Sequence, residues 1–153
     1  MSKSPLEDVQ LSFMLSNYSS LEITKMIVSE IGWEIFEYPE LIPDQNSNGE
    51  PTLSEVPFYG IKNNEGKVIF KGTPFKDDLF KSIDFTNYHF MGVLLRYLSS
   101  NNYTVKIKVD GDSASVDLYC KGQEDSYTRV ASKANLLPRT LCEAFLLNKK
   151  KDL

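Results

Sequence analysis

The chain has 153 residues, of which 41% are hydrophobic and 25% are charged. This length predicts a single domain, residues 1–153, with one continuous core. The sequence contains no run of about 18 apolar residues, the length that a membrane-spanning helix needs, and this excludes a protein built around such a helix.

The net charge of −4 is unevenly distributed along the chain. Residues 1–83 carry 7 Lys and Arg against 13 Asp and Glu, whereas residues 84–153 carry 10 against 8. A nucleic-acid-binding domain is usually strongly basic, so this balance excludes an extended nucleic-acid footprint. The mildly basic second half leaves room for a small anionic ligand.

The chain has two cysteines, Cys120 and Cys142, and they form neither a disulfide framework nor a metal-ligand spacing. The first residues also lack the apolar core of a signal peptide. We therefore expect a reduced cytoplasmic protein with no metal and no cofactor.

Two helices are predicted in the first third of the chain. Ser4-Pro5 begins a short helix in an N-terminal helical extension, residues 1–18, because Ser caps helices and Pro suits their first position. The capping box Ser19-Ser20-Leu21-Glu22 begins a second helix, and Gly32 is placed to end it. A short strand at 34–38 follows.

The next segment, residues 39–57, contains four of the seven prolines and a run of small polar residues. This composition predicts a proline-rich loop insertion. Beyond it, residues 58–61 and 67–71 flank Asn63-Asn64-Glu65-Gly66 and predict a hairpin. One helical turn over 76–83 leads into the second half.

Residues 84–153 predict a helix–strand–strand–strand–helix unit. Thr86 or Asn87 caps a helix, and the segment 103–109 then alternates apolar and polar residues as a half-buried strand does. Asp110-Gly111 is a hairpin signal. A third strand near 126–132 and a helix from about Pro138 complete an α+β protein with a small antiparallel meander.

This order of elements resembles the phage ABA sandwich domain, a family of small proteins encoded in phages and prophages. The matching residues are Gly32-Trp33, Thr86-Asn87 before Leu94, Leu95 and Leu98, and Pro138 to Leu146 with Cys142. The family pattern has Asp at the position of Asn87 and Trp at that of Gly92, so the match is partial. The resemblance implies a two-layer or α-β-α sandwich and a phage origin, and it implies no catalytic residue.

No catalytic set is evident in the sequence. His89 is the only histidine, and both cysteines lie on apolar faces where free cysteines are usually inert. Asp110-Gly-Asp112 lacks the further ligands of a calcium loop. We therefore predict that the protein is not an enzyme.

One predicted surface has a composition suited to binding. If Val105, Ile107, Val116, Leu118 and Val130 face the core, strand alternation sends cations and aromatic rings to the opposite face. We call it the outer face of the meander. Cations bind phosphates and rings stack on bases. The tentative ligand-binding residues are Lys106, Lys108, Tyr119, Tyr127 and Arg129, with Lys121 and Asp117 beside them. The alternatives are a solvated sheet face or a face covered by a helix or a second subunit.

Three functions remain open at this point. The first is a phage-derived binder that sequesters a nucleotide second messenger as a form of counter-defence. The second is a protein-interaction module in which the acidic first half and residues 39–57 contact a host or phage protein. The third is an enzyme that cleaves a nucleotide signal. Each of them is compatible with a homo-oligomer.

Overall fold

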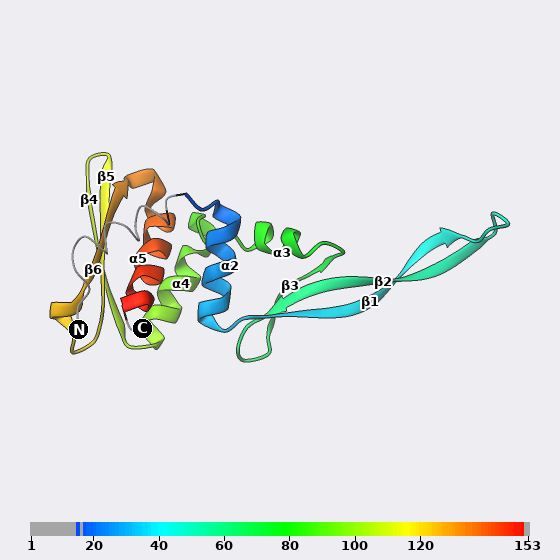
Figure 1. The fold of residues 1–153 in the computed structure, drawn as a ribbon, viewed down its shortest axis with the longest axis horizontal. Helices are drawn as coiled ribbons and strands as arrows, with labels where there is room; N and C mark the ends of the chain where they lie inside the picture. Colours follow the sequence, from blue (N-terminus) through cyan, green and yellow to red (C-terminus); the bar gives the residue numbers. More distant parts are fainter. Residues whose placement is uncertain (1–14, 16, 152–153) are drawn as a thin grey trace. The chain divides into compact units, whose positions relative to one another are not determined.

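The computed structural model describes residue 15 and residues 17–151, and this part of the chain is α+β (Figure 1). It contains two three-stranded antiparallel sheets and four α-helices. The predicted fold class, with helices packed on a small antiparallel sheet, is confirmed. The predicted N-terminal helical extension at 1–18 lies almost entirely outside the described residues.

The chain divides into two compact units, although its length led us to expect one domain. Unit 1 combines residues 1–27 with 84–153, and unit 2 is residues 28–83. Unit 2 is therefore an insertion in the sequence of unit 1.

Unit 1 contains the predicted helix–strand–strand–strand–helix order. Its elements are α4 (Tyr88–Ser100), β4 (Tyr103–Asp110), β5 (Ser113–Cys120), β6 (Thr128–Lys133) and α5 (Leu137–Lys151), preceded by the start of α2 (Ser20–Ile31). Short 3-10 turns at Glu124–Ser126 and Ala134–Leu136 flank β6.

Two predicted helix starts, those of α2 and α4, are confirmed by their hydrogen bonds. At α2, the backbone N–H of Glu22 donates to Ser19 Oγ (3.1 Å) and that of Ser19 donates to Glu22 Oε2 (3.2 Å), which is a capping box. At α4, Asn87 is the cap, and its side-chain oxygen accepts from the backbone N–H of His89 at 3.1 Å.

The sheet of unit 1 is antiparallel with the order β4-β5-β6. Its helix-facing side carries Val116, Leu118 and Val130, which are buried as predicted. Ile107, predicted to share this core, is 40% exposed. The reason is that β4 is an edge strand whose exposure rises along its length, while α5 packs on β5 and β6.

Helix α5 lies between the sheet and α4 (Figure 1). This helix is buried on every side from 140 to 148. The three polar residues in this stretch are satisfied by hydrogen bonds. Thr140 donates to the carbonyl of Leu136 (2.9 Å), Asn148 donates to Thr128 Oγ1 (3.0 Å), and Glu143 accepts from Arg139 Nε (3.0 Å). Bonding of this kind is what permits polar groups in a core.

Unit 2 contains a second sheet, of order β1-β2-β3, and one short helix. Its elements are β1 (Glu34–Gln45), β2 (Pro51–Lys62), β3 (Val68–Thr73) and α3 (Lys76–Ser82), which packs on β2 and β3. The buried apolar residues of this unit include Ile61, Leu79 and Phe80.

The prediction of a loop at 39–57 is wrong. Strands β1 and β2 pair without interruption from Glu34–Lys62 to Gln45–Pro51, and they continue beyond β3 as a two-stranded ribbon (Figure 1). We call residues 39–57 the arm.

The positions of the prolines explain how a proline-rich segment can form strands. Pro39 faces Pro57, and facing pairs in an antiparallel ladder alternate between pairs that exchange two hydrogen bonds and pairs that exchange none. Proline has no N–H, so this pair is non-bonded, and every pair an even number of residues away is of the same kind. Pro43 and Pro51 belong to such pairs. All four prolines therefore sit where a backbone N–H would point away from the ribbon.

The arm ends in a turn built like the turn between β2 and β3. The side-chain oxygen of Asn46 accepts from the backbone N–H groups of Asn48 (2.9 Å) and Glu50 (3.0 Å). Asn63 accepts from the N–H groups of Glu65 and Lys67 in the same way. Both turns place a glycine with positive φ at the fourth position. The Asn-x-x-Gly spacing is therefore a shared turn signal.

Candidate functional site

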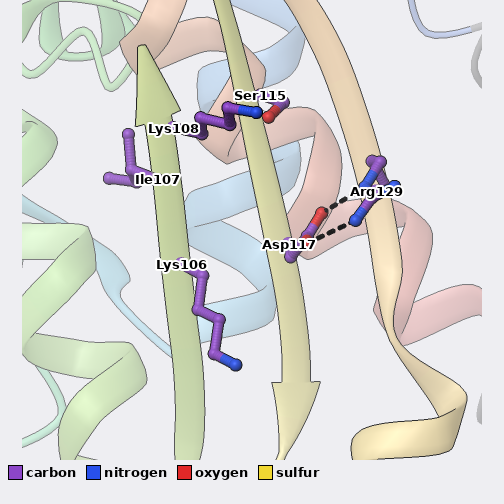
Figure 2. A pocket seen from close by; sticks show the side chains of 6 residues that line it. All are labelled: Lys106, Ile107, Lys108, Ser115, Asp117 and Arg129. Atoms are coloured by element: carbon purple, nitrogen blue, oxygen red, sulfur yellow. Dashed lines mark hydrogen bonds and ion pairs between the residues drawn. The ribbon is translucent and has the colours of Figure 1, made fainter.

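The predicted site residues on β4 and β6 lie on the outer face of the meander. Lys106, Asp117 and Arg129 form one row across the three strands, and Lys108 lies beside Ser115 in the next row (Figure 2). The row is set by the register of the hairpin that Gly111 closes.

Arg129 is held by Asp117 within the same face. Its Nε donates to Asp117 Oδ1 at 2.7 Å and its Nη2 donates to Oδ2 at 2.9 Å, a bidentate pair (Figure 2). These hydrogen bonds lower the pKa of Asp117 and raise the pKa of Arg129. Most of the positive charge of Arg129 is therefore compensated within the face.

The two predicted aromatic residues differ in accessibility. Lys106 Nζ lies 5.6 Å from the ring centre of Tyr119, and the guanidinium of Arg129 lies 5.2 Å from that of Tyr127. Tyr119 is only 9% exposed, whereas Tyr127 is 44% exposed. A ring that is buried offers no platform for stacking, so Tyr127 is the aromatic residue of this pair that a ligand can reach.

An open depression of about 370 Å³ lies on this face. It is lined by Lys106, Ile107, Lys108, Ser115, Asp117 and Arg129 (Figure 2). Lys106 and Lys108 form no ion pair with any described residue. The two ammonium groups and the Ser115 hydroxyl are suited to hold an anionic group such as a phosphate.

Cys142, which the sequence predicts to be inert, is buried in unit 1. Burial raises the pKa of its thiol, and Sγ donates to the carbonyl of Phe85 at 3.3 Å. Both effects disfavour the reactive thiolate. Cys120 is half-buried and unpaired with another cysteine. His89 packs edge-on against Phe90.

Two further properties concern metals and membranes. In residues 15 and 17–151, no three His, Cys, Asp or Glu side chains come together as ligands for a metal ion. None of the helices in the same part of the chain is long and apolar enough to span a membrane.

A second candidate surface is the arm, which the loop prediction missed. The two faces of the ribbon differ in composition. The aromatic face carries Phe36, Tyr38, Ile42, Val56 and Phe58, and the proline face carries Glu37, Pro39, Leu41, Pro43, Pro51, Leu53, Glu55 and Pro57. On the aromatic face the rings pack on one another, with centroids 5.9 Å apart for Phe36–Tyr38 and 6.3 Å apart for Tyr38–Phe58.

The proline face is the exposed side of the arm. Leu41 and Leu53 are 62% and 61% exposed. A depression of about 370 Å³ on this face is lined by Glu37, Pro39, Glu55 and Pro57. Residues 39–57 have four carboxylates and no Lys, Arg or His, and Glu37 adds a fifth carboxylate beside them. The arm therefore combines apolar exposure with negative charge.

The chain has no significant match among protein-family models, curated proteins or solved structures.

Proposed function

We propose that this chain is a non-enzymatic binding protein that contacts another protein through the arm. The observation that carries this proposal is the exposure of Leu41 and Leu53 on a ribbon that is acidic throughout. A two-stranded ribbon gains little stability by itself in water. Exposed apolar surface surrounded by charge is typical of a surface that another protein covers.

The composition of unit 1 supports binding over catalysis. Cys142 of this unit is a free, buried cysteine, and burial raises the pKa of its thiol. A covalent mechanism needs a nucleophile activated by a neighbouring base. His89 instead lies against Phe90.

The test is a shortened arm. Deleting residues 40–43 and 53–56 removes four facing pairs, so the alternation of the remaining ladder and the turn at Asn46 are kept. We expect affinity capture from cells that contain the partner to recover it with the intact chain and to lose it with the shortened one. The control is Lys106→Ala with Lys108→Ala on unit 1, which should keep the partner. Partner recovery by the shortened chain would contradict the proposal.

A second function is favoured by Lys106 and Lys108, which line an open depression and form no ion pair with a described residue. It is the sequestration of a nucleotide-like anion. The resemblance to the phage ABA sandwich family supports phage or prophage origin and action in the host cytoplasm as counter-defence.

Thermal shift and calorimetry against cyclic nucleotides and cyclic ADP-ribose isomers test this second function. Binding should weaken in Lys106→Ala with Lys108→Ala, and the ligand should be recovered unchanged. A lack of binding across the panel would remove this function, and a cleaved ligand would favour an enzyme.

A further inference from the structure

If the arm binds a partner protein, as in the proposed function, its two faces and its edges decide how that partner is recognised. The two faces of the ribbon present different surfaces to a partner. Rings on the aromatic face already contact one another and are half-buried. On the proline face, by contrast, the side chains of Leu41 and Leu53 are mostly exposed. The proline face therefore has the larger apolar area left to bury.

The edges of the arm are poor sites for an added strand. An added strand needs outward N–H and C=O groups along the edge of its acceptor. On β1, Pro39 and Pro43 remove outward N–H groups, and on β2, Pro51 and Pro57 do the same. Prolines on edge strands block pairing of this kind. A partner must therefore be recognised by the side chains of a face.

The depression on the proline face has the chemistry of a receptor for a cationic side chain. Its lining places Pro39 opposite Pro57 and adds one carboxylate from each strand, Glu37 and Glu55. Neither carboxylate forms an ion pair or a hydrogen bond with a described residue. The aliphatic stem of a Lys or Arg can lie on apolar rings while its charged head meets carboxylates.

The apolar residues of this face continue directly from the depression. Leu41 faces Glu55, and Leu53 faces Pro43 in the next pair of the same kind. Residues two apart on one face of a strand are about 7 Å apart. A ligand segment that places a cation in the depression therefore brings neighbouring side chains over the leucines.

We propose that the proline face binds a segment of another protein in which Lys or Arg lies beside apolar residues, and that it does so through side chains without adding a strand to either edge. The negative charge of the arm selects the cations, and the exposed leucines select the apolar neighbours. Specificity of this kind needs both parts, because an acidic surface alone attracts any polycation.

The test measures binding of a fluorescent peptide in which Arg and Lys alternate with Leu and Val, by anisotropy with the full chain. Glu37→Gln with Glu55→Gln should weaken binding by about tenfold. The matched control is Glu40→Gln with Glu50→Gln, which removes the same charge from the aromatic face and the turn and should change affinity less than about twofold. Equal losses in both variants, or no binding by the unaltered chain, would overturn the proposal.

Two further measurements test the role of the leucines and the side-chain mode of binding separately. Leu41→Ser with Leu53→Ser should weaken the same peptide, whereas a peptide with Ser in place of Leu and Val should bind the unaltered chain weakly. A peptide methylated on its backbone nitrogens cannot add to a strand edge and should retain binding, and its loss would overturn the side-chain mode. If partner capture depends on the arm but not on Glu37, Glu55 or the leucines, this inference fails while the proposed function stands.

Discussion

The sheet β4-β5-β6 of unit 1 and the arm, residues 39–57 of β1 and β2, are both antiparallel. Among the described residues, a helix packs on one face of the first, whereas the side chains of the arm stay exposed or half-buried. In unit 1, α5 covers Val116 and Leu118 completely. In the arm, residues of similar size such as Leu41 remain mostly exposed. The comparison shows that alternation makes a strand, while burial of one face decides whether the strand belongs to a core or to a surface.

The largest expected effect on stability comes from truncating a side chain at the centre of the core of unit 1. Phe145 on α5 is fully buried and packs edge-on against Tyr97 and Tyr103, at centroid distances of 5.9 and 6.0 Å. Phe145→Ala should lower the free energy of unfolding by about 3–5 kcal/mol, measured by chemical denaturation. A loss below about 1 kcal/mol would mean that α5 is not the centre of this core.

A smaller effect is expected where β2 meets β1. A Cβ on Gly60 would overlap the Phe36 ring and come within 2.9 Å of Lys71 Cβ. Gly60→Ala should therefore destabilise the protein by about 1–3 kcal/mol. Gly92→Ala is the control, because Gly92 lies within α4 with open space around it. Gly92→Ala should stabilise the protein by up to about 1 kcal/mol. Thermal unfolding of the two variants checks the prediction, because their unfolding temperatures should shift in opposite directions.

The open edges of the arm provide a prediction about association. Pro39→Thr with Pro57→Thr restores one outward N–H on each strand, so self-association at high concentration should rise. Analytical ultracentrifugation measures the apparent mass. Val56→Thr, which changes a side chain without changing any N–H, should leave the mass unchanged. An unaltered mass in the proline variant would show that the prolines do not protect the edges.

The smallest effect is expected at the exposed pair of unit 1. Hydrogen bonds from Arg129 lower the pKa of Asp117, so the pair stabilises the folded state above the unfolded pKa of about 4. This contribution is lost as the pH falls through the lower folded pKa. Thermal unfolding of the unaltered chain and of Asp117→Asn should therefore differ at neutral pH and converge in acid. A difference in unfolding temperature that grows as the pH falls would contradict the predicted direction of the pH dependence.

Much of unit 1 was predictable because its signals are local. The capping box at Ser19 and the hairpin at Asp110-Gly111 each depend on neighbours in sequence, and both are confirmed. The exposure of Ile107 was not predictable, because it depends on which strands α5 reaches. The full burial of α5 depends likewise on elements distant in sequence.

The arm was missed because proline density usually means a loop. What distinguishes it is the even spacing of Pro39, Pro43, Pro51 and Pro57, which keeps every proline in non-bonded pairs once the register is known. The turn at Asn46 could have been found from the sequence, since its Asn-x-x-Gly spacing repeats that of Asn63. The predicted site on the outer face of the meander remains a proposal, with Arg129 held by Asp117.

The order of the elements has a consequence for synthesis on the ribosome. Unit 1 is interrupted by residues 28–83, and α5, which fills its centre, follows every other described element of that unit. The chain emerges from its N-terminal end and domains fold as units. All residues of unit 2 have been synthesised long before α5. By contrast, α2, α4 and the meander cannot complete their core until α5 has been synthesised. The nascent apolar surfaces of unit 1 are therefore the part of this chain that chaperones would have to protect.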